Sequence, residues 1–191
     1  MALPADHRLT TLLSSVSNLP RMTAMQRFQK LTPCLWFDDQ AEAAAKFYCS
    51  IFDHSKITAL THYSKVGQEF HGRPEGSVMT VSFELDGQTF TGLNGGPVFT
   101  FNEAISFQVN CQNQEEVDHF WGNLSAGGPV QAQQCGWLKD KFGVSWQIVP
   151  VAFMHMMTDP DQTKAQRAMQ AMFGMKKLDI AELERAFAGQ S

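Results

Sequence analysis

The chain has 191 residues, of which 43% are hydrophobic and 18% are charged, with a formal net charge of -4. This length allows one domain or two fused half-size modules around a buried core. The charged residues form no basic stretch, so the composition favours neither nucleic acid nor a membrane surface as a partner. No apolar run reaches the roughly 20 residues that a membrane-spanning helix needs.

The cysteines and the N-terminal region indicate the compartment. The four cysteines have no C-x-x-C spacing, which argues against a structural zinc site and against a disulfide framework. Residues 1–29 lack the basic start and the apolar block of a secretory signal, and we expect them to form an N-terminal extension. Reduced thiols and the absence of a signal predict a cytoplasmic protein. The cysteines are Cys34, Cys49, Cys111 and Cys135.

Residues 30–97 predict the order strand, helix, strand, strand, strand. The helix places Ala44 and Tyr48 on one apolar face, and Asp38 or Asp39 precedes it as a candidate cap. Asp86-Gly87 is the strongest two-residue hairpin signal in the chain. A polar, glycine-rich loop is expected at 64–76. The predicted strands are 31–37, 56–63, 77–85 and 88–93, and the predicted helix is 40–52.

Residues 98–151 repeat this order. Asn113 followed by Glu116 is the capping-box pattern that opens a helix, and Gly127-Gly128-Pro129 ends it. The two predicted helices begin about 74 residues apart, which is typical of two copies of one β-α-β-β-β module. The predicted strands of this half are 104–110, a short one near Val130, 135–139 and 144–149.

Residues 152–191 predict a C-terminal helical segment. Pro150 and Pro160 bracket an expected linker, and helices are predicted at 164–175 and 179–188. Asp179 with Glu182 repeats the capping-box spacing at the start of the second helix. Three methionines of the first helix share one face, which predicts a packing surface and a contact in a dimer. They are Met169, Met172 and Met175.

The hairpin at 135–150 gathers the most distinctive side chains. Its polar turn, Asp140–Gly143, joins two strands and brings a thiol, a lysine and two tryptophans together. Each module has one face covered by its helix and one bare face. Two bare faces pairing, within one chain or across a homodimer, would form a cupped mixed sheet with a hollow suited to a small ligand. The expected fold class is therefore α+β.

Several blocks in order resemble the PhnB-like branch of the vicinal oxygen chelate superfamily, the glyoxalase and bleomycin-resistance group. The resemblance spans about 30–188 and implies paired modules and a homodimer; members of the branch are often labelled demethylubiquinone methyltransferase. The blocks are Thr32-Pro-Cys-Leu-Trp-Phe-Asp, Glu75-Gly-Ser-Val-Met-Thr-Val-Ser-Phe-Glu-Leu-Asp-Gly-Gln, Leu93-Asn-Gly-Gly-Pro, Phe101-Asn-Glu-Ala-Ile-Ser, Gln114-Glu-Glu-Val-Asp, Cys135-Gly-Trp-Leu-Lys-Asp and Phe142-Gly-Val-Ser-Trp-Gln.

The resemblance also implies where a metal would bind. Superfamily members hold a divalent metal through four strand positions, and these fall on Thr32, a position near Gly92, Ala104 and Gln147. Only Gln147 has a side chain that ligates metals, so no metal and no other cofactor is predicted. A divalent metal remains the alternative, in a displaced site built from three loop residues. These are His62, Glu69 and His71.

The predicted function is binding of a small apolar or aromatic molecule in the cupped sheet. Cys135 beside Lys139 is a candidate nucleophile, although a strand cysteine is commonly a packing residue. The alternatives are a metal-dependent lyase, isomerase or dioxygenase, and a methyltransferase. A methyl-donor site needs a glycine-rich turn that leads into a helix, whereas the glycines at 92–96 lead toward another strand. The pocket candidates are Trp36, Asn94, Cys135, Trp137, Lys139, Trp146 and Gln147.

Overall fold

The computed structural model describes residues 29–190. The chain divides into residues 1–30 and 31–191, and the fold below is that of the second unit. Almost all of the predicted N-terminal extension, residues 1–28, lies outside the described residues. In the described part, no helix is long and apolar enough to span a membrane. The fold is mixed α+β, as predicted, with two small mixed sheets.

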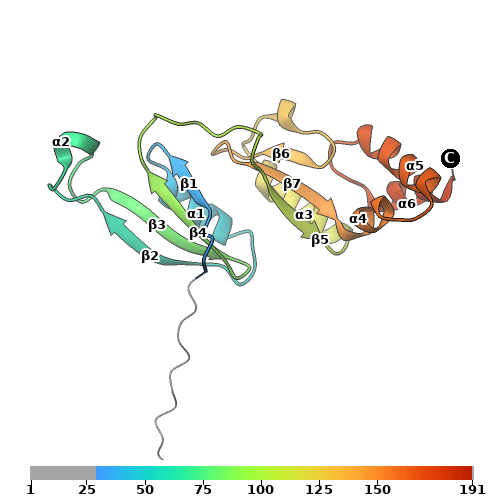
Figure 1. Cartoon of the computed structure of the whole chain (residues 1–191), viewed down its shortest axis with the longest axis horizontal. Coiled ribbons are helices and arrows are strands. Elements are labelled where there is room, and N and C mark those ends of the chain that lie inside the picture. The colour runs from blue at the N-terminus through green and yellow to red at the C-terminus, as the bar shows by residue number, and fades with distance from the viewer. Residues whose placement is uncertain (1–28, 191) are drawn as a thin grey trace, which may run out of the picture. The chain divides into compact units, whose positions relative to one another are not determined.

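The first module has the predicted order of elements (Figure 1). Its sheet has the order β1-β4-β3-β2, in which β1 runs parallel to β4 and the other pairs are antiparallel. Helix α1 covers one face, because Ala41, Ala44 and Tyr48 are fully buried against the sheet. The elements are β1 (Cys34–Phe37), α1 (Ala41–Cys49), β2 (Lys56–His62), β3 (Val78–Leu85) and β4 (Gln88–Asn94).

Two local features of this module differ in how well the sequence predicts them. The hairpin at Asp86-Gly87 is confirmed, with φ of 45° and 79° at the two turn residues, both in the left-handed region. The expected cap at Asp38 or Asp39 is wrong: Asn94 accepts the α1 hydrogen bond from the Ala41 N–H at 2.8 Å. The polar, glycine-rich loop expected at 64–76 contains a short helix, α2 (Gln68–His71). The cap comes from 53 residues away, so local sequence cannot reveal it.

The second module is one strand shorter than predicted. Its sheet has the order β5-β7-β6, and the strand expected near Val130 is a 3-10 helix, Val130–Ala132. Pro129 precedes this turn and lacks the N–H that a strand ladder needs, and only Gln134 makes an isolated bridge to Trp137. Asn113 caps α3 as predicted, accepting from the Glu116 N–H at 2.9 Å. The elements are β5 (Phe107–Cys111), α3 (Gln114–Ser125), β6 (Trp137–Lys139) and β7 (Ser145–Pro150).

The C-terminal segment contains three helices rather than two. The linker expected after Pro150 is helix α4 (Val151–Met157), because proline occupies its N-cap with φ near -63° and tolerates a helix that begins there. Helices α5 (Gln162–Phe173) and α6 (Ile180–Ala188) follow, and Asp179 caps α6 as predicted. They pack around their own small core, which includes Met156, Met175 and Leu183.

The main core joins the two modules at Asp140. This residue is 1% exposed, although the sequence places it in a polar turn. Its carboxyl accepts hydrogen bonds from Tyr48 Oη, Trp146 Nε1 and the Phe142 N–H at 2.8 Å, and from the Val144 N–H at 3.0 Å. Tyr48 is the donor from the first module. The carboxyl therefore pins the β6–β7 hairpin to α1.

Burial perturbs both members of this pair. Desolvation raises the pKa of the Asp140 carboxyl, and the four hydrogen bonds that it accepts only partly offset this effect. Burial, followed by the nearby Asp140 carboxyl, raises the pKa of Tyr48 well above its usual value. Tyr48 therefore keeps its proton in the folded state at pH values where an unfolded tyrosine loses it.

We expect Tyr48→Phe to destabilise the protein by about 2 kcal/mol near pH 7, because it removes a hydrogen bond to a buried carboxyl. The raised pKa of Tyr48 makes its contribution complete below about pH 10 and makes it fall as pH rises toward the folded-state pKa. The difference between the wild type and Tyr48→Phe should therefore narrow above about pH 10. Urea unfolding of both proteins from pH 7 to 11 measures it, and a constant difference contradicts the assignment.

Candidate functional site

Strand β7 has two faces with different roles. Trp146 and Ile148 are buried in the core beneath α3, so Gln147 and Val149, which alternate with them, point to the opposite, open face of the sheet. The parallel pairing of β5 with β7 sets Gln108 beside Gln147. Two glutamine side chains therefore lie next to each other on the open face.

A pocket of about 510 Å³ lies on this open face, and we call it the second-module pocket. The C-terminal segment supplies much of its wall, because α4 and α5 contribute aromatic rings and thioethers to it. Helix α4 follows directly on β7 and contacts it (Figure 1). The wall is mostly apolar, and glutamine and cysteine side chains supply its polar groups. The lining residues are Gln108, Cys135, Trp137, Gln147, Val149, Phe153, Met154, Met157, Met172, Phe173 and Leu178.

A tight turn at Cys135-Gly136 holds the C-terminal segment against the sheet. Both residues have positive φ, 54° and 83°, and their N–H groups donate to the carbonyls of Met175 and Lys176 at 2.8 Å each. A Cβ on Gly136 would lie 2.9 Å from the Ile148 carbonyl oxygen, so only glycine fits there. The loop between α5 and α6 is thus fixed beside the pocket.

Two of the polar groups of the pocket are amides with free oxygens. Gln147 Nε2 donates to Ser106 Oγ at 2.8 Å, and Gln108 Nε2 donates to Asn110 Oδ1 at 2.7 Å. Among the described residues, neither glutamine Oε1 accepts a hydrogen bond. The pocket therefore offers two neutral acceptors on an otherwise apolar surface, an arrangement that suits an O–H or N–H group of an apolar ligand.

Of the seven predicted pocket residues, Cys135, Trp137 and Gln147 line the second-module pocket together. Their role in binding stays a prediction. Lys139 forms an ion pair with Glu103, and the hydrogen bond from the lysine lowers the pKa of the Glu103 carboxyl. The lysine therefore pairs with a carboxylate rather than with the Cys135 thiol, which is the pairing that the nucleophile hypothesis requires. Trp146 lies in the core instead, 2% exposed, and donates to Asp140.

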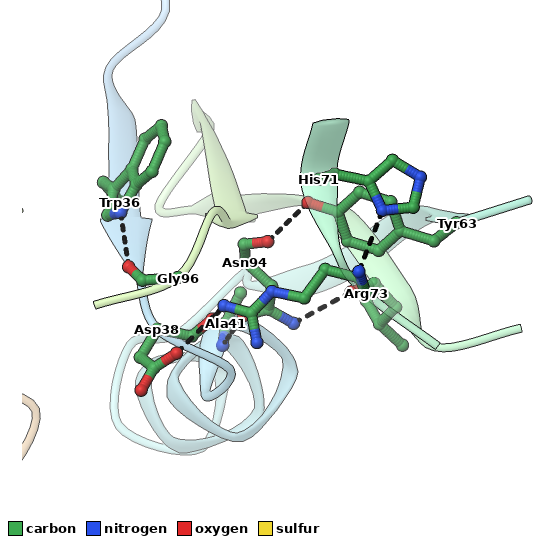
Figure 2. Close-up of polar contacts among 9 residues, drawn as sticks. Trp36, Asp38, Ala41, Tyr63, His71, Arg73, Asn94 and Gly96 are labelled. Atoms are coloured by element: carbon green, nitrogen blue, oxygen red, sulfur yellow. Dashed lines mark hydrogen bonds and ion pairs between the residues drawn. The ribbon is translucent and has the colours of Figure 1, made fainter. Parts of the chain in front are cut away.

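Trp36 and Asn94 belong to the first module. The Trp36 indole N–H donates to the Gly96 carbonyl at 2.8 Å (Figure 2), and its ring packs on Phe99. A Cβ on Gly95 would lie 2.2 Å from the Trp36 ring, which makes glycine necessary there. The glycine-rich stretch after β4 therefore has a packing function. It leads into no helix, so it does not form the nucleotide-binding turn of a methyl-donor site.

The residues present do not fit the superfamily's divalent metal. Thr32, Gly92 and Ala104 supply no metal-binding side chain, and a neutral glutamine at 147 is a weak ligand for zinc or nickel. Across residues 29–190, no group of three or more His, Cys, Asp and Glu side chains is placed to hold a metal ion.

The displaced alternative lies at the end of β2 and in α2. His71 stacks on Tyr63, with ring centroids 4.5 Å apart, and its Nδ1 accepts from the Arg73 N–H at 3.0 Å. His62 and Glu69 are exposed, and they form no metal-binding group with His71 in the described part of the chain.

Sequence reasoning missed most of the pocket wall. Gln108 alternates correctly on its predicted strand, but the register that sets it beside Gln147 depends on a partner strand far along the chain. Phe153, Met154 and Met157 fall in the segment interpreted as a linker. Their helical spacing between two prolines is the signal that would have found them.

Comparisons with known proteins support the fold and the family. Residues 29–149 match the family model described as 3-demethylubiquinone-9 3-methyltransferase. The PhnB protein from Bacillus cereus is 35% identical, with a TM-score of 0.56 over 64% of this chain and 100% of that one. A Staphylococcus aureus protein is 28% identical, with a TM-score of 0.29 over 64% and 96%. A glyoxylase/bleomycin resistance protein/dioxygenase domain from Frankia is 13% identical, with a TM-score of 0.41 over 65% and 93%.

A search of curated proteins found no match. The family match ends at residue 149, before α4, although the resemblance seen in the sequence was expected to extend to 188. The helices that form much of the pocket wall therefore lie outside the matched region.

Proposed function

We propose that this chain, which belongs to the 3-demethylubiquinone-9 3-methyltransferase family of PhnB-like proteins within the vicinal oxygen chelate superfamily, binds a small apolar or aromatic molecule in the second-module pocket. The observation that carries this proposal is the pocket itself, which residues of α4, of α5 and of the open face of the sheet line together. Its volume of about 510 Å³ falls within the roughly 300–1,000 Å³ typical of small-molecule sites. The binding proposed here requires no metal.

The lining indicates the chemistry of the ligand. Trp137, Phe153 and Phe173 provide aromatic surface, and the thioethers of the wall contact aromatic rings favourably at their edges. Gln108 and Gln147 supply carbonyl acceptors beside each other at the base. A flat aromatic molecule with one hydroxyl group satisfies both properties.

Two enzymatic functions are the alternatives. A metal-dependent lyase, isomerase or dioxygenase requires a ligand set that the four superfamily positions do not supply. Methyl transfer, which the family description names, requires a methyl-donor site, and the glycine-rich stretch that would form it is occupied by the packing of Trp36. Neither alternative has an observation in its favour comparable to the pocket.

We predict that 1-naphthol binds saturably and that Phe173→Ala weakens its binding about fivefold, because part of an aromatic contact is lost. Phe173 lines the pocket but is 55% exposed, so the variant should fold. Met169→Ala is the matched control, since Met169 is on the same helix, is 43% exposed and does not line the pocket. Calorimetric titration of the three proteins measures the effect.

The same titration distinguishes the proposed metal-free binding from the metal-dependent alternative. Naphthol affinity should be unchanged after dialysis against EDTA, and elemental analysis should find no stoichiometric metal. Equal weakening in both variants, or no saturable binding to the wild type, refutes the pocket as the site. Loss of binding after EDTA treatment supports the metal-dependent alternative instead.

We also propose that the protein is a homodimer. The segment between the modules exposes large apolar side chains: Val98 is 71% exposed, Phe99 62% and Ile105 74%. These three side chains lie within eight residues of one connecting segment, and large exposed apolar side chains of this kind fit a surface that a partner covers. A second copy is the occupant that the family resemblance implies.

Light scattering at micromolar concentration should give twice the monomer mass. Ile105→Asp should shift the protein toward a monomer, because a charge is placed in an apolar contact. Val66→Asp is the control, since Val66 is 86% exposed in the loop before α2. A wild-type monomer rules out the dimer, and dissociation by both variants rules out the assigned surface.

A further inference from the structure

A second, polar pocket of about 340 Å³ lies in the first module, and we call it the first-module pocket. It lies where the start of α1, the end of β4 and the segment between β2 and β3 come together. Unlike the second-module pocket, it is lined mainly by charged and hydroxyl side chains. The lining residues are Asp39, Glu42, Tyr63, Arg73, Pro74, Ser77, Val78 and Asn94.

Asn94 gives this pocket a fixed frame. The residue is 6% exposed; its Oδ1 accepts from the Ala41 N–H at 2.8 Å, and its Nδ2 donates to the Val78 carbonyl at 3.0 Å. The Tyr63 hydroxyl donates to the Asn94 carbonyl at 2.6 Å (Figure 2). Asn94 thereby joins helix α1, strand β3 and the end of β2 around the pocket.

The hydroxyl groups of the pocket can only accept hydrogen bonds. The Tyr63 hydroxyl has already donated its proton to Asn94, and the Ser77 hydroxyl donates to the Pro74 carbonyl at 2.6 Å. Asp39 is exposed and has no ion pair within residues 29–190, and Glu42 holds Lys46 through Oε1 at 2.6 Å. The pocket thus presents several acceptors to a ligand that carries N–H groups.

Arg73 is the donor of the pocket. Its Nη2 donates to the Asp38 carbonyl at 2.7 Å and to the Asp38 carboxylate at 2.9 Å, which holds the side chain across the pocket (Figure 2). The N–H groups on Nε and Nη1 have no partner among the described residues, and the side chain is 22% exposed. A Cβ on Gly96 would lie 2.9 Å from Nη2, so glycine makes room for the guanidinium.

The balance of charge narrows the ligand class. Carboxylates in and around the pocket outnumber cations by one, counting Asp38, Asp39 and Glu42 against Arg73 and Lys46. A simple anion would meet this excess of negative charge, and a simple amine would leave the guanidinium N–H groups without a partner. A molecule that carries both a carboxylate and an ammonium satisfies both sides.

We propose that the first-module pocket binds a small zwitterion of the α-amino acid class. The carboxylate accepts from the free N–H groups of Arg73, and the ammonium donates to Asp39 and to the hydroxyl oxygens of Tyr63 and Ser77. This site is independent of the apolar ligand of the second-module pocket. It has a different location and the opposite polarity.

The test compares L-alanine with propionate and ethylamine, which lack its ammonium and its carboxylate respectively. We expect saturable ¹H–¹⁵N shift changes at Arg73 and Ala41 with alanine, with a dissociation constant on the order of millimolar. Propionate and ethylamine should bind at least about tenfold more weakly. Binding of either analogue as tight as that of alanine, or no saturable shifts with alanine, overturns the proposal.

Variants assign the two ends of the ligand. Asp39→Asn should weaken alanine binding several-fold and leave propionate binding unchanged or stronger, because only the ammonium contact is lost. Arg73→Lys keeps the charge but not the planar fork, and should weaken alanine binding about tenfold. Lys56→Met, which removes an exposed charge on β2 that pairs with Glu84 of β3, is the control. Equal effects of Asp39→Asn on alanine and propionate contradict the assigned orientation.

Discussion

The buried carboxyl of Asp140 is the interaction on which the arrangement of the two modules depends. A buried carboxyl without donors costs several kcal/mol, and this one is satisfied by four hydrogen bonds, of which only that from Tyr48 comes from the first module. The other three donors belong to the hairpin itself. Asp140 therefore shapes the β6–β7 turn and fastens it to α1 with the same group.

Fixing one face of this hairpin also fixes the other. Trp146 turns inward to Asp140, so its neighbour Gln147 turns outward beside Gln108, on the open face of the sheet. The tight turn at Cys135-Gly136 then holds the loop between α5 and α6 beside the pocket on that face. Because the C-terminal segment lies beyond the family match, much of the wall of the second-module pocket comes from a part of the chain that the family model does not describe.

The sequence predicts features whose cause is local. The turn at Asp86-Gly87 and the caps at Asn113 and Asp179 each depend on residues within one turn, and all three are confirmed. The α1 cap depends on Asn94, which arrives from another strand. The strand expected near Val130 is a 3-10 helix that follows Pro129, which lacks the N–H of a strand ladder. Trp137 and Trp146 have equal strand propensity, and only strand register decides that one lines a pocket and the other joins the core.

A double-mutant cycle between Tyr48 and Asp140 tests the central claim most directly. The free energy of unfolding is measured by urea denaturation at pH 7 for the wild type, Tyr48→Phe, Asp140→Asn and the double variant. If the hydrogen bond between them fastens the hairpin to α1, the double variant should be less destabilised than the sum of the single variants by about 1 kcal/mol or more. Additivity within about 0.3 kcal/mol would contradict the account.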